Sequence, residues 1–519
     1  MADDVILVGF QDSDNLGLGY LASSLAGHGF AARVLDFRLG SASILEEVRA
    51  AQPLLVGFSL IFQYYLPQFA RMAAYLRDHG VDCHFCAGGH FPSLRPAEVL
   101  ERVLSLDSIA RCEGETTLVE LVGCLFEGRD WHHIKGICYR DGEIVETDRR
   151  MLVADIDDLP WPVRSGDGPA IIGRRTAPLL ASRGCARDCS FCSIRQFYRQ
   201  ADGRKVRVRD PKKVVEEMRF LRHDHDISVF LFQDDDFPLG RSGGRHWVEQ
   251  FVEALHSAEL IGRVIWKISC RADEVEPDLF ALMRDSGLYT VYLGLESGNA
   301  AGLETLNKGL RVADGIRATG ILKDLDLFPC YGFMMFDPSS TFESIEENVR
   351  FLEQVTGDGA TPAVFCRMLP YAGTPIEASL IAQGRLCGDV EDPDYDFLDA
   401  SMSLFFDTVN SMTADWLHGP HALATQLMWA WQEYWVLRRL FPPLPGMDAY
   451  GRVVRSLTAN SNRYLLDLVR TVASAHKDGV GDIPSVAQVR ATSSSIQDRL
   501  LSERDEFVRL NQTIILGAL

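Results

Sequence analysis

Three cysteines at C-x3-C-x2-C spacing, Cys185, Cys189 and Cys192, lie in the segment GCARDCSFC (184–192). Three thiolates on one short loop can ligate three irons of a [4Fe–4S] cluster, which leaves the fourth iron open to a small molecule. A zinc site would need a fourth Cys or His nearby, and none lies within ten residues on either side. The alternative is that the three cysteines are ordinary small buried residues.

Phe191 stands just before the third cysteine. This aromatic residue and the spacing of the cysteines resemble the radical S-adenosylmethionine (SAM) superfamily. The resemblance implies that the open iron binds the amino and carboxylate groups of SAM. It also implies that an electron from the cluster cleaves SAM to a 5′-deoxyadenosyl radical, which abstracts a hydrogen atom. Phe191 is assigned to the SAM site on the same ground.

The elements that must position this loop alternate between strands and helices over residues 177–375. Six such βα units predict a partial or full α/β barrel, with its chemistry at the carboxyl ends of the strands. The cysteine loop follows the first of these strands, APLLASRGC (177–185), so we expect it at that rim.

Four further rim residues are assigned to SAM by resemblance. Asp234 and Asp235 in FQDDDF match a frequent F-x-D-D-x-F pattern, Arg271 in SCRAD can fork onto a carboxylate, and Glu296 in GLESG resembles a SAM-binding glutamate. For Asp235, Arg271 and Glu296 the alternative is an ordinary loop or surface ion pair. Arg183 and Arg187, which flank the cysteines, are expected to tune the charge of the cluster or to meet an electron donor.

Residues 1–145 also alternate between strands and helices, beginning with VILVGF (5–10). This pattern predicts parallel βαβ units in a doubly wound, Rossmann-like α/β sheet. Ligands of such sheets bind outside the carboxyl ends of the strands, where the strand order reverses.

The loops at those ends resemble cobalamin-binding Rossmann domains, which carry D-x-H-x-x-G, then Ser, then Gly-Gly after successive strands. The cobalt-ligating His position of that motif holds Asp14 here. We therefore expect cobalamin to bind without a histidine below the metal. The alternative is a domain of this fold that binds another ligand or none. For His90, a place in a turn exposed to solvent is as compatible with the sequence as contact with the corrin. The residues assigned to cobalamin are Asp12, Asp14, Gly17, Ser59, Gly88, Gly89 and His90.

The expected organisation is a cobalamin-binding Rossmann-like domain (1–145), a linker (146–176), a radical SAM barrel (177–375) and a helical C-terminal domain (376–519). The helical pattern after residue 375 is rich in Trp and Leu. Its first interpretation is a helical core. The alternative is a substrate lid in which Trp429, Trp431 and Trp435 line a cavity.

The chain has 519 residues, twelve cysteines and a formal net charge of −20. This charge argues against a nucleic-acid partner, because phosphate binding requires clustered Lys and Arg. The sequence contains no apolar run of about eighteen residues, so no membrane span is predicted. The acidic N-terminus lacks the pattern of a signal peptide, so a cytoplasmic location is expected, where cysteines stay reduced or bind metal.

The order of domains resembles the cobalamin-dependent (class B) radical SAM enzymes. The resemblance implies a methyltransferase that methylates an unactivated carbon of a small, natural-product type substrate, by way of methylcobalamin and a deoxyadenosyl radical, as in antibiotic biosynthesis. It also implies a flavodoxin- or ferredoxin-type electron donor and leaves open a substrate tethered to a carrier protein. The alternatives are an enzyme with the same cofactors that rearranges, oxidises or cyclises its substrate, and a metal-binding interaction protein without catalysis.

Overall fold

The computed structural model describes every residue except 1–3, 12–13, 165–167, 241–242 and 480. The chain packs into two compact units, and each of them combines segments that are distant in sequence. Unit 1 comprises Met1–Pro169, Ala177–Glu217 and Leu369–Tyr395; unit 2 comprises Ala170–Thr176, Met218–Met368 and Asp396–Leu519.

The core of unit 1 is a seven-stranded sheet with the order β2-β1-β3-β4-β5-β6-β7. The first five strands are parallel, and β6 and β7 add an antiparallel hairpin at one edge. The strands are β1 (Val5–Gly9), β2 (Ala32–Asp36), β3 (Leu55–Ser59), β4 (His84–Gly88), β5 (Ser108–Ala110), β6 (Ile137–Asp141) and β7 (Glu143–Glu146). The predicted doubly wound sheet is confirmed.

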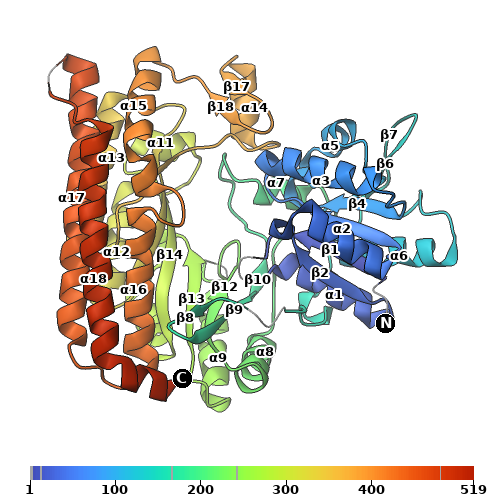
Figure 1. Ribbon diagram of the computed structural model, residues 1–519, viewed down its shortest axis with the longest axis horizontal. Helices are drawn as coiled ribbons and strands as arrows, with labels where there is room; N and C mark the ends of the chain where they lie inside the picture. The colour runs from blue at the N-terminus through green and yellow to red at the C-terminus, as the bar shows by residue number, and fades with distance from the viewer. Residues whose placement is uncertain (1–3, 12–13, 165–167, 241–242, 480) are drawn as a thin grey trace. The chain divides into compact units, whose positions relative to one another are not determined.

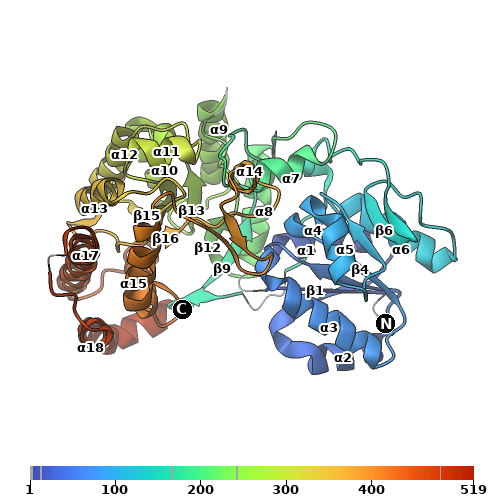
Figure 2. The same ribbon diagram turned by 90° about the horizontal axis from the view of Figure 1, so that it is seen from above.

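Helices cover both faces of this sheet, as Figures 1 and 2 show. Alternate residues of β1 enter two separate cores: Ile6 and Val8 pack with α2 and α3, and Val5 and Leu7 pack with α1 and α6. The helices of the domain are α1 (Leu16–Gly27), α2 (Gly40–Ala51), α3 (Leu66–Asp78), α4 (His90–Leu94), α5 (Pro96–Arg102) and α6 (Glu115–Glu127).

The remaining segments of unit 1 come from the cysteine-loop region and from residues Leu369–Tyr395. They are β10 (Ser182–Arg183), α7 (Ile194–Arg199), β11 (Arg207–Val208), α14 (Pro375–Ala382), β17 (Leu386–Gly388) and β18 (Pro393–Tyr395). Two further elements, β9 (Arg174–Leu179) and α8 (Pro211–Asp224), carry the chain between the units.

Unit 2 is built on an open parallel sheet, the half-barrel, in which β12 to β16 are neighbours in chain order, with β9 and β8 at the edge of the sheet. Its strands are β8 (Ala170–Ile171), β12 (Ile227–Phe232), β13 (Ile265–Cys270), β14 (Leu288–Glu296), β15 (Phe328–Phe336) and β16 (Cys366–Arg367). The connecting helices are α9 (Gly244–Ser257), α10 (Pro277–Asp285), α11 (Ala300–Thr305), α12 (Val312–Asp324) and α13 (Phe342–Thr356). The predicted barrel is confirmed in its partial form.

The helical region predicted after residue 375 is confirmed, and its long helices belong to unit 2. They are α15 (Ala400–Leu417), α16 (Leu423–Leu440), α17 (Met447–Asp478) and α18 (Val486–Ala518). Figure 1 shows the last two, in red, side by side. Among the described residues, every helix is too short or too polar to span a bilayer.

The tryptophans of α16 are divided between core and surface. Trp431 is only 2% exposed, and its indole N–H donates to the Thr458 hydroxyl at 3.1 Å, whereas Trp429 is 49% exposed. Trp435 is also buried. Two of the three residues of the lid alternative therefore belong to the helical core.

Replacing Trp431 with alanine is expected to lower the free energy of unfolding by about 3–5 kcal/mol, because it removes a large buried side chain. The matched variant Trp429→Ala is expected to stay within about 0.5 kcal/mol of the parent. Denaturant titration followed by circular dichroism measures both. Equal losses in the two variants would contradict this assignment of core and surface.

Candidate cofactor sites

The cysteine loop begins directly after β10 and ends at α7. Gly184 has a φ of +85°, and a Cβ atom there would lie 2.0 Å from the carbonyl oxygen of Lys205, so the turn into the loop requires glycine. All three cysteines are partly exposed. The Arg187 backbone N–H donates to Cys185 Sγ at 3.4 Å.

Three thiols on one short loop suit the separate irons of a cube. Within the part of the chain that the structure describes, no three His, Cys, Asp or Glu side chains gather as one metal ion would require. A cube offers each thiolate a different iron, so its ligands need not converge on one point.

Cys112 packs against α7 but does not act as a fourth ligand in the observed geometry. Its thiol donates to the carbonyl of Phe197 at 3.5 Å. Burial also raises the pKa of Cys112 to about 11, so this thiol stays protonated at neutral pH.

The residues after β16 hold the cysteine loop against the Rossmann-like domain. The Ile376 N–H donates to the Ser190 carbonyl at 3.0 Å, and the Ala372 N–H donates to Gln63 Oε1 at 2.6 Å. Arg95 pairs with Glu377 at 2.6 Å. The segment 372–377 thus fixes the cysteine loop within unit 1.

A buried ion-pair network joins the same domain to β10 and β11. Arg183 pairs with Glu113 at 3.1 Å and with Glu115 at 2.8 Å, and Arg207 pairs with Glu113 at 2.7 Å. Burial raises the pKa of Glu113, but the hydrogen bond from Arg207 and the charge of Arg183 outweigh it and hold that pKa below its ordinary value. Arg183, which also lies over the Tyr20 ring, packs inside the unit, and its expected role in tuning the charge of the cluster or meeting an electron donor stays a prediction.

The predicted cobalamin residues after β3 and β4 meet at the carboxyl edge of the first sheet. Ser59 is in register with Gly88, and the Leu60 N–H donates to the Gly88 carbonyl at 2.8 Å. Gly89 has a φ of +108°, and a Cβ atom there would lie 2.4 Å from the Leu60 carbonyl oxygen. The Gly-Gly pair therefore lets the β3 and β4 loops approach closely beside the reversal of strand order between β1 and β3.

The loop after β1 is described only in part. Asp12 lies outside the described residues. Asp14 has a φ of +62°, Asn15 caps α1 through a hydrogen bond from the Leu18 N–H at 3.1 Å, and Gly17 is exposed in the first turn of α1. The roles of Asp12, Asp14 and Gly17 toward cobalamin stay predictions.

His90 begins α4 at the same edge and packs edge-to-face on the Phe197 ring at 4.4 Å. Burial lowers the pKa of His90 from 6.5 to about 4. The imidazole is therefore neutral at physiological pH, when it can both donate and accept a hydrogen bond.

Below pH 6.5 this histidine is expected to destabilise the fold, because His90 takes up a proton in the unfolded chain but stays neutral in the folded chain, where its pKa is lower. The loss grows as the pH falls to about 4 and reaches at most about 3 kcal/mol. The variant His90→Gln should show a flatter pH dependence in that window. Denaturant titrations at pH 7, 5.5 and 4.5 measure the free energy of unfolding of both proteins. The same pH dependence in parent and variant would contradict the assignment of a lowered pKa to His90.

In unit 2 the end of β14 carries the third group of predicted residues. Glu296 is buried, has a φ of +64° and accepts a hydrogen bond from Lys308 Nζ at 2.9 Å. A non-glycine residue in this region stores strain, which is frequent at functional sites. Gly294 and Gly332 pair in register, and a Cβ atom on Gly294 would lie 2.7 Å from Glu296 Oε1. The two glycines make room for the carboxylate.

The other SAM candidates occupy the ends of β12 and β13. Asp234 is buried and Asp235 is exposed directly after β12. Arg271 is buried; its guanidinium donates to the Lys308 carbonyl at 2.7 Å and to Asp273 at 3.0 Å. Arg271 and Glu296 thus meet at Lys308, a residue that sequence reasoning missed. Their contacts to SAM stay predictions, as do those of Phe191, which lies partly exposed in the cysteine loop.

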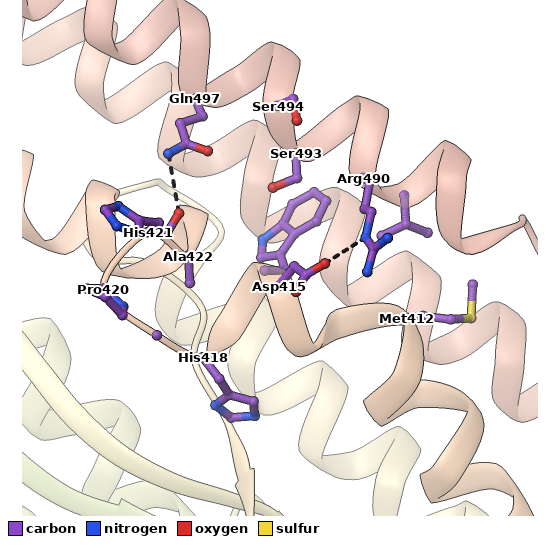
Figure 3. Close-up of a pocket in the computed structure, with 13 residues that line it drawn as sticks. Met412, Asp415, His418, Pro420, His421, Ala422, Arg490, Ser493, Ser494 and Gln497 are labelled. Atoms are coloured by element: carbon purple, nitrogen blue, oxygen red, sulfur yellow. Dashed lines mark hydrogen bonds and ion pairs between the residues drawn. The ribbon is translucent and has the colours of Figure 1, made fainter.

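A separate pocket of about 400 Å³ opens in the helical region of unit 2 (Figure 3). It lies between the end of α15, the loop 418–422 and the first turns of α18, and the ion pair of Asp415 with Arg490 at 2.6 Å borders it. No predicted cofactor residue lines it.

Two domain families match the chain. The B12 binding domain model covers residues 3–122, and the Radical SAM superfamily model covers residues 179–352. These domains confirm the predicted resemblance and the predicted cofactors, because the first implies cobalamin and the second implies a [4Fe–4S] cluster with SAM.

Among curated proteins, the chain is similar to an anaerobic magnesium-protoporphyrin IX monomethyl ester cyclase of Cereibacter sphaeroides, with 31% identity over 56% of this chain and 47% of the cyclase. It is also similar to the corresponding cyclase of Rubrivivax gelatinosus, with 28% identity over 69% of this chain and 66% of the relative. An uncharacterized methyltransferase of Pyrococcus horikoshii shares 26% identity over 72% of this chain and 79% of its own. The alignments thus span about half to two thirds of the two cyclases.

Two solved structures share the fold. The cobalamin-dependent SAM radical enzyme OxsB aligns with a TM-score of 0.67 over 98% of this chain and 81% of its own. The radical SAM methyltransferase TsrM from Kitasatospora setae aligns with a TM-score of 0.62 over 73% of this chain and 75% of its own. Both share 19% sequence identity with this chain, so the likeness shows the fold alone.

Proposed function

We propose that this chain, which combines a B12-binding domain with a radical SAM domain, is a methyltransferase that acts on an unactivated carbon of a small, natural-product type substrate. The observation that carries the proposal is the packing of the three-thiol loop and the Rossmann-like edge into one unit. Enzymes named as methyltransferases occur among its relatives, such as the Hopanoid C-3 methylase of Methylococcus capsulatus, at 25% identity over 61% of this chain.

The bound cofactors supply a carbon-centred radical and a transferable methyl group. The protein supplies placement and exclusion of water. Cys185, Cys189 and Cys192 hold three irons of the cluster. Gly88 and Gly89 admit the corrin at the sheet edge.

In unit 2 the Glu296 carboxylate, held by Lys308, accepts hydrogen bonds from SAM at the half-barrel rim. Arg271 then acts as a positioning residue, because its guanidinium fixes the backbone of Lys308.

A second function of the same cofactors is supported by the cyclases of Cereibacter sphaeroides and Rubrivivax gelatinosus among the relatives. Such an enzyme would form or rearrange bonds in its substrate without moving a methyl group. We place the natural partners in the same proposal: a small substrate, free or tethered to a carrier protein, and a flavodoxin- or ferredoxin-type reductant in the cytoplasm. A role in antibiotic biosynthesis belongs to the same proposal.

Product counting tests the proposal on the anaerobically reconstituted protein with candidate substrates from the products of neighbouring genes. Methyl transfer is expected to release S-adenosylhomocysteine and 5′-deoxyadenosine in roughly equal amounts, because one SAM donates the methyl group and another gives the radical. The measurement is quantitative chromatography with mass detection. Deoxyadenosine with a modified but unmethylated substrate would replace the methyltransferase with the second function.

A further inference from the structure

The half-barrel has an inner face that turns away from its connecting helices. The outer face packs on those helices, as the edge-to-face contact of Trp266 with Phe251 of α9 shows. Lys267 and Ser269 alternate with these outward residues along β13, so they point to the inner face. Ser269 is in register with Tyr292 of the parallel strand β14, which places Tyr292 on the same face.

These three side chains carry hydrogen-bond donors that nothing in the described chain engages. Neither a hydrogen bond nor an ion pair involves the side chain of Lys267, Ser269 or Tyr292 among the described residues. The one contact of the ammonium is with the Tyr292 ring, whose centroid lies 5.8 Å from Lys267 Nζ. Tyr292 is 40% exposed, although α16 packs on the same face at Cys330, whose Sγ lies 3.6 Å from Met428 Sδ.

No carboxylate balances Lys267 either. The nearest acidic site on β14 is Glu296, and its Oε1 is already paired with Lys308. The Cys330 thiol faces Lys267, but burial raises the pKa of Cys330 to about 11, so it carries no charge. Lys267 is partly buried, and burial lowers the pKa of its ammonium.

A poorly solvated ammonium without a counter-ion costs free energy, and an anionic ligand removes that cost. The Ser269 and Tyr292 side chains stand on the same face, and each hydroxyl can donate a hydrogen bond to an oxygen anion. Burial and, to a smaller extent, the charge of Glu296 raise the pKa of Tyr292, so the phenol keeps its proton and acts as a donor. Gly332 leaves the space that the phenol occupies, since a Cβ atom there would lie 2.5 Å from the Tyr292 hydroxyl.

We propose that Lys267, Ser269 and Tyr292 form a binding site for an oxyanion, a carboxylate or a phosphate, of the small-molecule substrate. This inference rests on the proposed function, because it assigns the inner face of the half-barrel to the substrate. It states the class of substrate: a molecule with an anionic group that anchors on β13 and β14.

The test is the rate at which acetic anhydride labels Lys267 in the anaerobically reconstituted full-length protein, read by peptide mass spectrometry. Inorganic phosphate or acetate, at ionic strength matched with chloride, is expected to slow labelling of Lys267 by about threefold or more, because a bound anion holds the amine protonated. The exposed Lys213 is the internal control and should be unaffected. Protection by only one of the two anions identifies the carboxylate or the phosphate as the group that binds.

Variants give a second measurement. Phosphate affinity, from phosphorus nuclear magnetic resonance titration, is expected to fall about tenfold in Lys267→Met and to stay within about threefold in Lys267→Arg. If Lys267→Met does not fold, Ser269→Ala and Tyr292→Phe each remove one donor and should each weaken binding.

Three outcomes would overturn the site: no protection by either anion, equal affinity in the variants, or protection by SAM alone, which would assign Lys267 to the cofactor. The proposed function fails separately, if no S-adenosylhomocysteine forms while Lys267 is still protected.

Discussion

Replacing Cys185 with alanine is expected to abolish reductive SAM cleavage and to lower the iron content of the anaerobically reconstituted protein well below about four per chain. Under the proposed function, three thiolates of the loop hold a cube of four irons, so the loss of one leaves a second iron without a protein ligand. Deoxyadenosine formation under dithionite should fall by at least about 100-fold, since the radical requires an intact cluster.

Cys387→Ala is the matched control, because Cys387 is exposed in β17 and lies outside the cysteine loop. This variant should keep its iron and its SAM cleavage. If Cys185→Ala keeps both its iron and its SAM cleavage, the assignment of the loop is refuted, whether or not Cys112 replaces the lost ligand.

Gly89→Val is expected to remove corrinoid binding from the N-terminal domain. A side chain at this position meets the Leu60 carbonyl oxygen at 2.4 Å, and the φ of +108° is unfavourable for any residue with a Cβ atom. The β3 and β4 loops must then separate, which reshapes the edge proposed to admit the corrin. Affinity for hydroxocobalamin should fall at least about tenfold, and the free energy of unfolding by about 3 kcal/mol.

Absorbance titration with hydroxocobalamin measures the effect, and denaturant titration separates it from unfolding. Gly123→Ala serves as the control, since Gly123 lies within α6 and a Cβ atom there meets nothing within 4 Å. Its stability should stay the same or rise slightly, because alanine is the better helix former. Unaltered corrinoid binding in a folded Gly89→Val protein would place the ligand elsewhere.

The sequence was sufficient to predict the two sheets, because strand and helix patterns alternate regularly and the strands are continuous apolar runs. VILVGF and LLVGFSLIF read as buried strands, and β1 and β3 are indeed buried within them. The same regularity predicted which loops share an edge. Local pattern therefore gave Ser59, Gly88 and Gly89 at one edge without any tertiary information.

Packing between distant segments could not be predicted. Gln63 contacts Ala372, and Arg95 contacts Glu377, across more than half of the chain, and nothing local marks either pair. The pairing of Lys308 with Glu296 was missed for the same reason. The residues 369–395 read as the end of the barrel and the start of the helical region, yet they pack in unit 1. The three predicted boundaries between the four segments stay predictions, alongside this division by packing.

The helical region shows a different limit. Its composition predicted helices and a Trp-rich core, but composition does not tell which of the three tryptophans of α16 are buried. Trp431 meets Thr458 of α17, whereas Trp429 faces away. Helical periodicity separates the two residues by about 200°, so the phase of the helix decides which is buried. That phase depends on the partner helices.

The most direct test of the central claim is electron paramagnetic and electron–nuclear double resonance of the reduced cluster with SAM whose carboxylate carries oxygen-17. An iron without a protein ligand should bind SAM, so the account predicts a changed cluster signal and a resolved oxygen-17 coupling. A cluster signal that is indifferent to SAM and shows no such coupling would mean that a fourth side chain closes the cube, and would contradict the account.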